Sequence, residues 1–265
     1  MALILAKALI ITLWLSVVFA IFGIFVIIKR MAFFSDGIAH AAVLGLAIGF
    51  TMGLSNNIII IILESIIFAI LIFLLEKNTK INPDALVSII FVISLSFGLI
   101  ILSSQKGYQP ELINFIIGNP LVMSNFDFYF ILIFCLLTLI FIIFNFKKIL
   151  LVILDPTEAR LININSYTYE LVFYIFLALS VVLGIKIGGV MLITSFLILP
   201  PTIASFIAKS LQDLISKSII IAVVSVIVGY MLAYLYNFPV SASIILFSSI
   251  IFILMFFNKY LSNYK

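Results

Sequence analysis

The sequence predicts an all-α membrane protein, a polytopic bundle of about nine transmembrane helices. Hydrophobic residues make up 66% of the chain and charged residues only 9%, whereas a soluble domain has about half and a quarter. The mean hydropathy of +1.44 agrees. Apolar stretches of about 20 residues, the length that crosses a bilayer, recur between short polar clusters. All 265 residues are therefore expected to form a single transmembrane domain, residues 1–265, with no soluble domain.

The candidate spans run over residues 5–28, 35–54, 58–75, 85–102, 127–146, 168–185, 188–207, 217–236 and 239–257. The first is longer than a signal-peptide core and is followed directly by Lys29 and Arg30, so we expect it to be retained. The second is rich in alanine and glycine, and small side chains let helix backbones approach closely, which predicts a place inside the bundle. The fifth is rich in phenylalanine and isoleucine and suits the lipid-facing rim.

Lysine and arginine predict the orientation, because cytoplasmic loops carry more of them. With the N-terminus outside, only Lys7, Lys106 and Lys186 lie on the outer side, and the other 11 of the 14 basic residues lie inside. The C-terminus is then cytoplasmic. The basic residues are scattered singly at span ends and form no nucleic-acid-binding patch, so the expected surroundings are membrane lipid and not nucleic acid.

The predicted outer connection, residues 103–126, contains an apolar piece at 112–117. This piece is too short to cross the bilayer and is expected to lie at the interface or to re-enter the membrane. Glu111 and Asp127 lie on the same side, where they are candidates for contact with a partner.

The predicted inner connection, residues 147–168, holds a helix-start signal. Asp155 can cap a helix, with Pro156 at its first position and Glu158 in its first turn. We expect a short capped helix on the cytoplasmic face that can dock a partner. Other carboxylates at inner span ends are expected to be solvated: Glu76, Asp84, Glu170 and Asp213.

Asp36 and His40, the only histidine in the chain, open the second span. Four residues apart on a helix, they share a face, and a carboxylate with an imidazole can ligate one divalent cation or share a proton. A charge inside a membrane costs about 3 kcal/mol on insertion scales, so both are functional candidates. Two alternatives stay open: Ser35 and Asp36 can cap the helix near water, and His40 can bond a backbone carbonyl. One pair supplies few ligands, but two copies around a two-fold axis would offer both pairs to one cation.

Two further spans hold residues that can serve a transport path. Glu64, in the third span, can line the path or take a proton, or it can be protonated and bonded to a neighbouring helix. The seventh span combines the hydroxyls of Thr194 and Ser195 with the Pro200-Pro201 pair. Prolines free backbone carbonyls and kink a helix, which suits a gate, although a static kink is the more frequent reading.

Enzymatic functions find no support in the sequence. It has no HExxH and no CxxC pattern, and one histidine cannot build a multi-histidine metal site. It also has no GxxxxGK[ST] phosphate loop, so an ATP-driven process would need its ATPase on another subunit.

Three stretches resemble the permease subunits of ABC-type zinc and manganese import systems. RMAFFSDGIAHAAVLGLAIG, residues 30–49, is similar to their second-helix region. GGVMLITSFLILPPTIA, residues 188–204, is similar to their late proline-bearing helix. DPTEARLININ, residues 155–165, looks like their coupling segment, within a coupling loop of about residues 150–167. The likeness covers most of the chain in order and spacing, and the first motif is the most specific.

The resemblance implies a fold like that of type II ABC importers and a homodimeric channel in the bacterial cytoplasmic (inner) membrane. It also implies a cytoplasmic ATP-binding subunit that uses the ATP and an extracytoplasmic metal-binding protein that delivers cargo. No cofactor would be bound permanently; the cargo would be a divalent metal, zinc foremost, with manganese and iron as further candidates. Asp36 and His40 match the pair that lines the metal path in this family. The residues implied to couple the chain to the ATPase are Asp155, Pro156, Thr157, Glu158, Ala159 and Arg160.

The chain departs from the family pattern at two places. Asn163 stands where many relatives have glycine, and the doubled Pro200-Pro201 replaces a single proline followed by alanine. Two rival functions also fit the residues alone. One is a proton-coupled secondary metal transporter that uses the aspartate–histidine pair and Glu64 as a relay. The other is a membrane scaffold that transports nothing.

Overall fold

The computed structural model describes residues 2–53, 58–104 and 123–262, and every regular element in these ranges is an α-helix. Eight of these helices are long and apolar enough to cross a bilayer, which confirms the predicted helical membrane bundle. The helices are α1 (Ala2–Ile28), α2 (Phe34–Thr51), α3 (Ile58–Asn78), α4 (Pro83–Ser103), α6 (Asn125–Leu154), α7 (Pro156–Leu161), α8 (Ser166–Ile207), α9 (Leu211–Tyr236) and α10 (Val240–Ser262).

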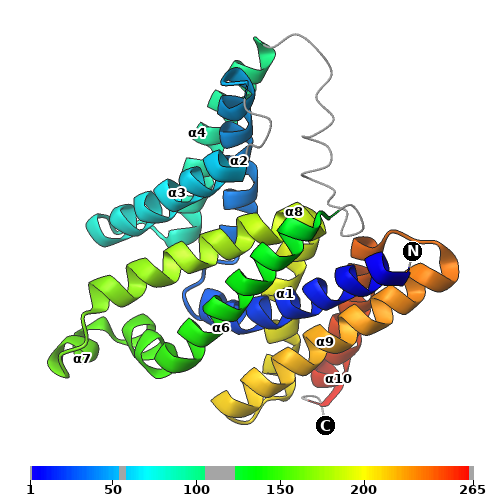
Figure 1. The fold of residues 1–265 in the computed structure, drawn as a ribbon. Helices are drawn as coiled ribbons and strands as arrows, with labels where there is room; N and C mark the ends of the chain where they lie inside the picture. Colours follow the sequence, from blue (N-terminus) through cyan, green and yellow to red (C-terminus); the bar gives the residue numbers. More distant parts are fainter. Residues whose placement is uncertain (1, 54–57, 105–122, 263–265) are drawn as a thin grey trace.

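Helix α8 supplies two of the predicted spans. Its 42 residues would extend about 63 Å as a straight helix, twice the bilayer core of about 30 Å. The backbone breaks at Gly189, where φ is 74° and ψ is 169°, and Figure 1 shows the two arms of α8 meeting at a corner. The predicted spans 168–185 and 188–207 are these two arms. Pro200 and Pro201 lie inside the second arm, so the one non-helical residue of α8 is a glycine and not a proline.

The predicted inner connection differs from the structure, and the apolar piece of the predicted outer connection lies outside the residues that the structure describes. Helix α6 continues to Leu154, well past the predicted span end at residue 146. Its last turns are Lys, Ile, Leu and Val, with no glycine or proline before Pro156 to end the helix. The inner connection is therefore shorter than predicted, with α7 between Asp155 and the start of α8 at Ser166. The predicted outer piece at 112–117 lies outside the described residues.

Helix α8 lies at the centre of the bundle. It contacts α1, α6, α9 and α10 on one side and α2 and α3 on the other, and Figure 1 shows α2, α3 and α4 as a group that stands beside the remaining helices. Of the residues in the most apolar stretch of α2, 67% are buried, as its small side chains predict. The corresponding shares are 33% in α6 and only 17% in α10. The exposed faces of α6 and α10 are apolar and suit contact with lipid.

Candidate functional site

Asp36 is held by a hydroxyl from a distant part of the chain. Thr194, in the second arm of α8, donates a hydrogen bond of 2.8 Å to Asp36 Oδ1, and the Ser35 hydroxyl donates to Thr194 Oγ1 at 3.1 Å. Thr194 Oγ1 also lies 3.0 Å from the Val190 carbonyl. Ser35 is buried and Asp36 half-buried. The structure therefore brings together Asp36 and one of the two predicted path hydroxyls.

The start of α2 tests whether Asp36 caps this helix. The residue before the first turn is Phe33, and no side chain of α2 caps it. The Phe33 N–H instead donates to Asp84 Oδ1 of α4 at 3.0 Å. The backbone donor at this end is thus satisfied from a neighbouring helix, and the Asp36 carboxylate is turned toward Thr194.

His40 lies one turn after Asp36, on the same face of α2. Its ring is half-buried and packs against Phe91 of α4, with ring centroids 5.2 Å apart and an interplanar angle of 56°. Phe91 also contacts the Phe33 ring edge to face, at 6.2 Å. The carboxylate therefore faces α8, while the imidazole borders α4.

Thr194, and with it Asp36, lies beside the middle of α1. Ile193, next to Thr194, packs beside Gly184 and Phe19: a methyl group on Gly184 would lie 2.8 Å from Ile193 Cδ1 and 3.0 Å from Phe19 Cε2. Phe19 is nine residues before the end of α1, which is about 14 Å along a helix.

The site offers two strong metal ligands and two hydroxyls. Within the part of the chain that the structure describes, no group of three or more His, Cys, Asp or Glu side chains is close enough to hold a metal ion. A carboxylate oxygen and an imidazole nitrogen are ligands for zinc, manganese or ferrous iron, but a protein site for these ions usually has at least three protein ligands. Asp36 and His40 of one chain would therefore make only part of a coordination set.

Glu64 does not join this set. It packs against Gly45, where a methyl group would lie 2.1 Å from Glu64 Oε2. Gly45 is nine residues after Asp36, or two and a half helical turns, so the two lie on opposite faces of α2. Glu64 is 8% exposed and neither carboxylate oxygen has a hydrogen-bond partner among the described residues. Ser195 is likewise buried, and its hydroxyl is unpartnered within the same residues.

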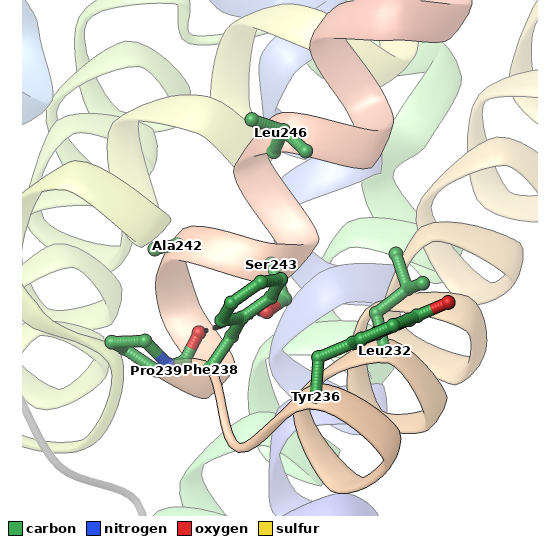
Figure 2. A pocket seen from close by; sticks show the side chains of 7 residues that line it. All are labelled: Leu232, Tyr236, Phe238, Pro239, Ala242, Ser243 and Leu246. Atoms are coloured by element: carbon green, nitrogen blue, oxygen red, sulfur yellow. Dashed lines mark hydrogen bonds between the residues drawn. The ribbon is translucent and has the colours of Figure 1, made fainter.

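A groove at the turn between α9 and α10 is too apolar for a cation. Its volume is about 400 Å³, and Figure 2 shows that it carries no carboxylate, imidazole or amine. The Ser243 hydroxyl donates to the Pro239 carbonyl at 3.0 Å and is thereby occupied. The groove is lined by Leu232, Tyr236, Phe238, Pro239, Ala242, Ser243 and Leu246.

Helix α7 forms as the sequence predicts. The Asp155 carboxylate accepts hydrogen bonds from the backbone N–H groups of Thr157 at 2.8 Å and Glu158 at 3.0 Å, and Pro156 is at the first helical position. The turn that follows has Asn163 at φ 60°, the left-handed conformation that asparagine tolerates better than most residues. Ala159 is fully buried, whereas Leu161 is 80% exposed.

A buried cluster of charges was not anticipated. We name it the inner ion cluster. It consists of Lys29, which directly follows α1, Glu76 and Lys77 of α3, and Glu170 and Tyr174 of α8. Glu170 pairs with both lysines, and Lys29 also lies 3.1 Å from Glu76. The prediction that Glu76 and Glu170 are solvated is wrong, because their side chains are only 19% and 5% exposed. The sequence does show opposite charges at the ends of different spans, which could have suggested ion pairs. Which charges pair, however, depends on which helices are neighbours in the fold.

The opposite end of the bundle has smaller polar contacts. Asp127 of α6 forms an ion pair of 2.6 Å with Lys186 of α8, and Lys7 of α1 donates to Asn125 Oδ1 at 2.7 Å. Asp127, a predicted partner contact, thus has its partner within the chain. Lys7 and Lys186, both predicted to lie outside, are found at the same end of α6.

Known proteins similar to this chain are membrane components of metal transport systems. The chain is 30% identical to the "High-affinity zinc uptake system membrane protein ZnuB" of Haemophilus influenzae over 256 residues, 97% of this chain and 98% of that protein. It is 30% identical to the "Manganese import system permease protein ScaB" of Streptococcus gordonii over 253 residues, 96% and 90% of the two chains.

A solved structure and a family model agree with these relatives. The structure "PsaBC from Streptococcus pneumoniae in complex with Fab" matches with a TM-score of 0.79 and 26% identity, covering 95% of this chain and 90% of that one. The model of the ABC 3 transport family matches residues 1–259. The resemblance seen in the sequence is therefore confirmed, and the chain belongs to the ABC 3 transport family.

Proposed function

We propose that this chain is the membrane permease subunit of an ATP-driven importer for a divalent transition metal, and that Asp36 and His40 receive the metal on its way across. The observation that carries this proposal is a carboxylate and an imidazole on one face of α2, a largely buried helix that is long and apolar enough to cross a membrane. Charged groups are costly inside a membrane, so they persist where they serve a path. The named relatives include zinc and manganese systems; zinc is our first candidate, and manganese and iron are the others.

Coordination by two chains would complete the metal site. Asp36 and His40 would supply two ligands, and a second copy related by a two-fold axis would supply two more. Four ligands shared by two chains can form and separate as the chains move, which suits a conduit, because a transported ion must leave as well as bind. Thr194 would stabilise the carboxylate, and Ser195 and the Pro200-Pro201 segment are proposed to line or gate the path; Glu64 could line it only on the opposite side of α2.

Energy would enter through α7. This helix is short, firmly capped by Asp155, and displays Glu158, Arg160 and Leu161 on its exposed surface. A surface with two opposite charges and a fully displayed leucine suits docking into a groove of a cytoplasmic ATP-binding subunit. The chain itself would then not hydrolyse ATP. An extracytoplasmic metal-binding protein would deliver the ion at the opposite face of the membrane.

The same geometry supports the proposed orientation in a bacterial inner membrane, with the N-terminus outside, the C-terminus inside and residues 1–265 as one permease domain. Lys29 and Lys77, both assigned to the cytoplasmic side, meet at Glu170. Lys7 and Lys186, both assigned to the outer side, contact residues in the first turn of α6. The pairs that share a side in the predicted topology thus share an end of the folded chain.

A proton-coupled secondary transporter is the weaker candidate. Its relay would pass through Asp36, His40 and Glu64, but Glu64 faces Gly45 on the opposite side of α2. A proton relay needs groups within hydrogen-bond reach of one another or of shared water. The separation of Glu64 from the other two therefore favours the ATP-driven function.

The test is uptake of radioactive zinc and, separately, manganese in cells that lack this chain and receive variants of it. Asp36→Asn and His40→Gln should reduce uptake to background, and Thr194→Val should reduce it about tenfold, the usual scale for a group that orients a ligand. Asp213→Asn, which removes a partly exposed carboxylate at the start of α9, is the matched control and should transport normally. Normal uptake by Asp36→Asn at wild-type membrane levels would refute the site, and loss of uptake in Glu64→Gln without copurifying ATPase would favour the proton relay.

A further inference from the structure

The first two turns of α8 present one continuous contact face. Tyr167, Glu170 and Tyr174 are spaced i, i+3 and i+7, which places them on the same side of the helix. Tyr167 packs edge to face on Phe73 of α3, with centroids 4.7 Å apart. Glu170 pairs with Lys29 and Lys77. The start of α8 is thereby joined to the ends of both α1 and α3.

Helix α7 is fastened to this start of α8. The Ser166 hydroxyl donates to the Pro156 carbonyl at 3.1 Å, and the Ile164 N–H donates to the Ala159 carbonyl at 2.9 Å. The first bond joins the two helices directly, the second closes the turn that follows α7, and Ser166 and Ala159 are buried. A displacement of α7 must therefore move the first turns of α8 with it, or break the bond between Ser166 and Pro156.

The same face of α8 reaches the segment that leads into α2. The Tyr174 hydroxyl donates to Glu76 at 2.5 Å and lies 3.1 Å from Met31 Sδ, and its ring is 5.8 Å from that of Phe34. Phe34 is the first residue of α2 and is fully buried. Asp36 follows Phe34 by only two positions in α2.

We propose that Lys29 and Glu170 are positioning residues that make α7, the start of α8 and the start of α2 move as one unit, so that ATPase-driven motion of α7 reaches Asp36. This inference rests on the proposed function. The pair suits the task because its charges are shielded from water: the Lys29 and Glu170 side chains are 6% and 5% exposed. Attraction between charges is stronger where water is excluded, and separating them would leave Lys29 with only Glu76 and Glu170 with only Lys77 as an ionic partner.

The cluster is balanced in charge, which allows a clean test. Two carboxylates, Glu76 and Glu170, face two lysines, Lys29 and Lys77. Removing one member leaves a buried charge without a partner and is expected to weaken the fold. Removing Lys29 and Glu170 together leaves one carboxylate and one lysine, Glu76 and Lys77, so the net charge of the cluster returns to zero and part of the lost stability should return. The mechanical link through the ion pair would still be missing.

The experiment uses the complete transporter in proteoliposomes, with its ATP-binding subunit and metal-binding protein, and measures zinc or manganese uptake, ATP hydrolysis and thermal stability. Glu170→Gln should lower the metal transported per ATP about tenfold, a usual scale for coupling between sites, with the KM for metal unchanged because Asp36 and His40 are intact. The double variant K29M/E170Q should regain part of the Tm that Glu170→Gln loses, while the transport ratio stays low. The control D213N/K217M removes the partly exposed ion pair of α9 and should keep the wild-type ratio.

Three results would overturn the inference while the proposed function stands. One is an unchanged ratio in Glu170→Gln. Another is an equal loss of uptake and hydrolysis in that variant, and the third is recovery of the ratio together with Tm in the double variant, which would mean that the pair only stabilises the fold. Failure of the proposed function looks different, because the wild-type chain would then neither take up metal nor associate with an ATPase.

Discussion

Replacement of Gly189 by alanine tests whether the corner of α8 depends on a conformation that only glycine adopts easily. At φ 74° and ψ 169°, a residue with a Cβ is strained by about 1–3 kcal/mol. The adjacent Gly188 is the matched control, since its φ is not in the positive range. A methyl group there would meet the end of the flexible Leu192 side chain, at 2.8 Å from Cδ2, which can rotate away.

Thermal unfolding of the purified chain in detergent measures the difference. With about 2–4 °C per kcal/mol for a chain of roughly this size, Gly189→Ala should lower Tm by about 2–12 °C. Gly188→Ala should leave Tm nearly unchanged, because alanine gains up to about 1 kcal/mol over glycine in a helix and offsets the adjustment of Leu192. Equal Tm values for the two variants would refute the argument that the corner rests on the backbone of Gly189.

Two further substitutions address other contacts. Replacing Glu158 and Arg160 of α7 together by alanine should uncouple ATP hydrolysis from metal uptake without loss of membrane insertion, since both side chains are exposed; intact transport in proteoliposomes would exclude α7 as the docking helix. Gly23→Ala should lower Tm, because a methyl group there would lie 2.0 Å from the Leu197 carbonyl oxygen, a backbone atom that cannot rotate away, at a cost of about 1–3 kcal/mol. A wild-type Tm for this variant would mean that α1 and α8 can separate without loss.

The sequence predicted those parts of the fold that depend on local composition. Apolar runs of membrane length located the spans, and the cap at Asp155 with Pro156 located α7. The small residues of α2 predicted its place inside the bundle. The end of α6 was missed because a helix can continue beyond the membrane wherever nothing in the sequence stops it, and the first such residue is Pro156.

The site was only half predictable for a physical reason. Asp36 and His40 share one helix, so their spacing alone placed them on one face. The bond from Thr194 joins residues 158 positions apart, and no local pattern encodes such a contact. The prediction for Glu170 was wrong for the same reason. A carboxylate at the end of a span is usually exposed to water, and only the packing of α1, α3 and α8 against one another buries this one.

Helix α6 is longer than the hydrocarbon core of a bilayer is thick, and this lets it act as a lever. Its 30 residues extend about 45 Å, against a core of about 30 Å. Its first turn is fastened by Asp127 to Lys186, and its last turn leads directly into α7. A tilt of only about 5° about the fastened end would shift α7 by about 4 Å. Small rearrangements among packed helices would thus be magnified at α7, and large displacements of α7 would be reduced to fine adjustments near Lys186.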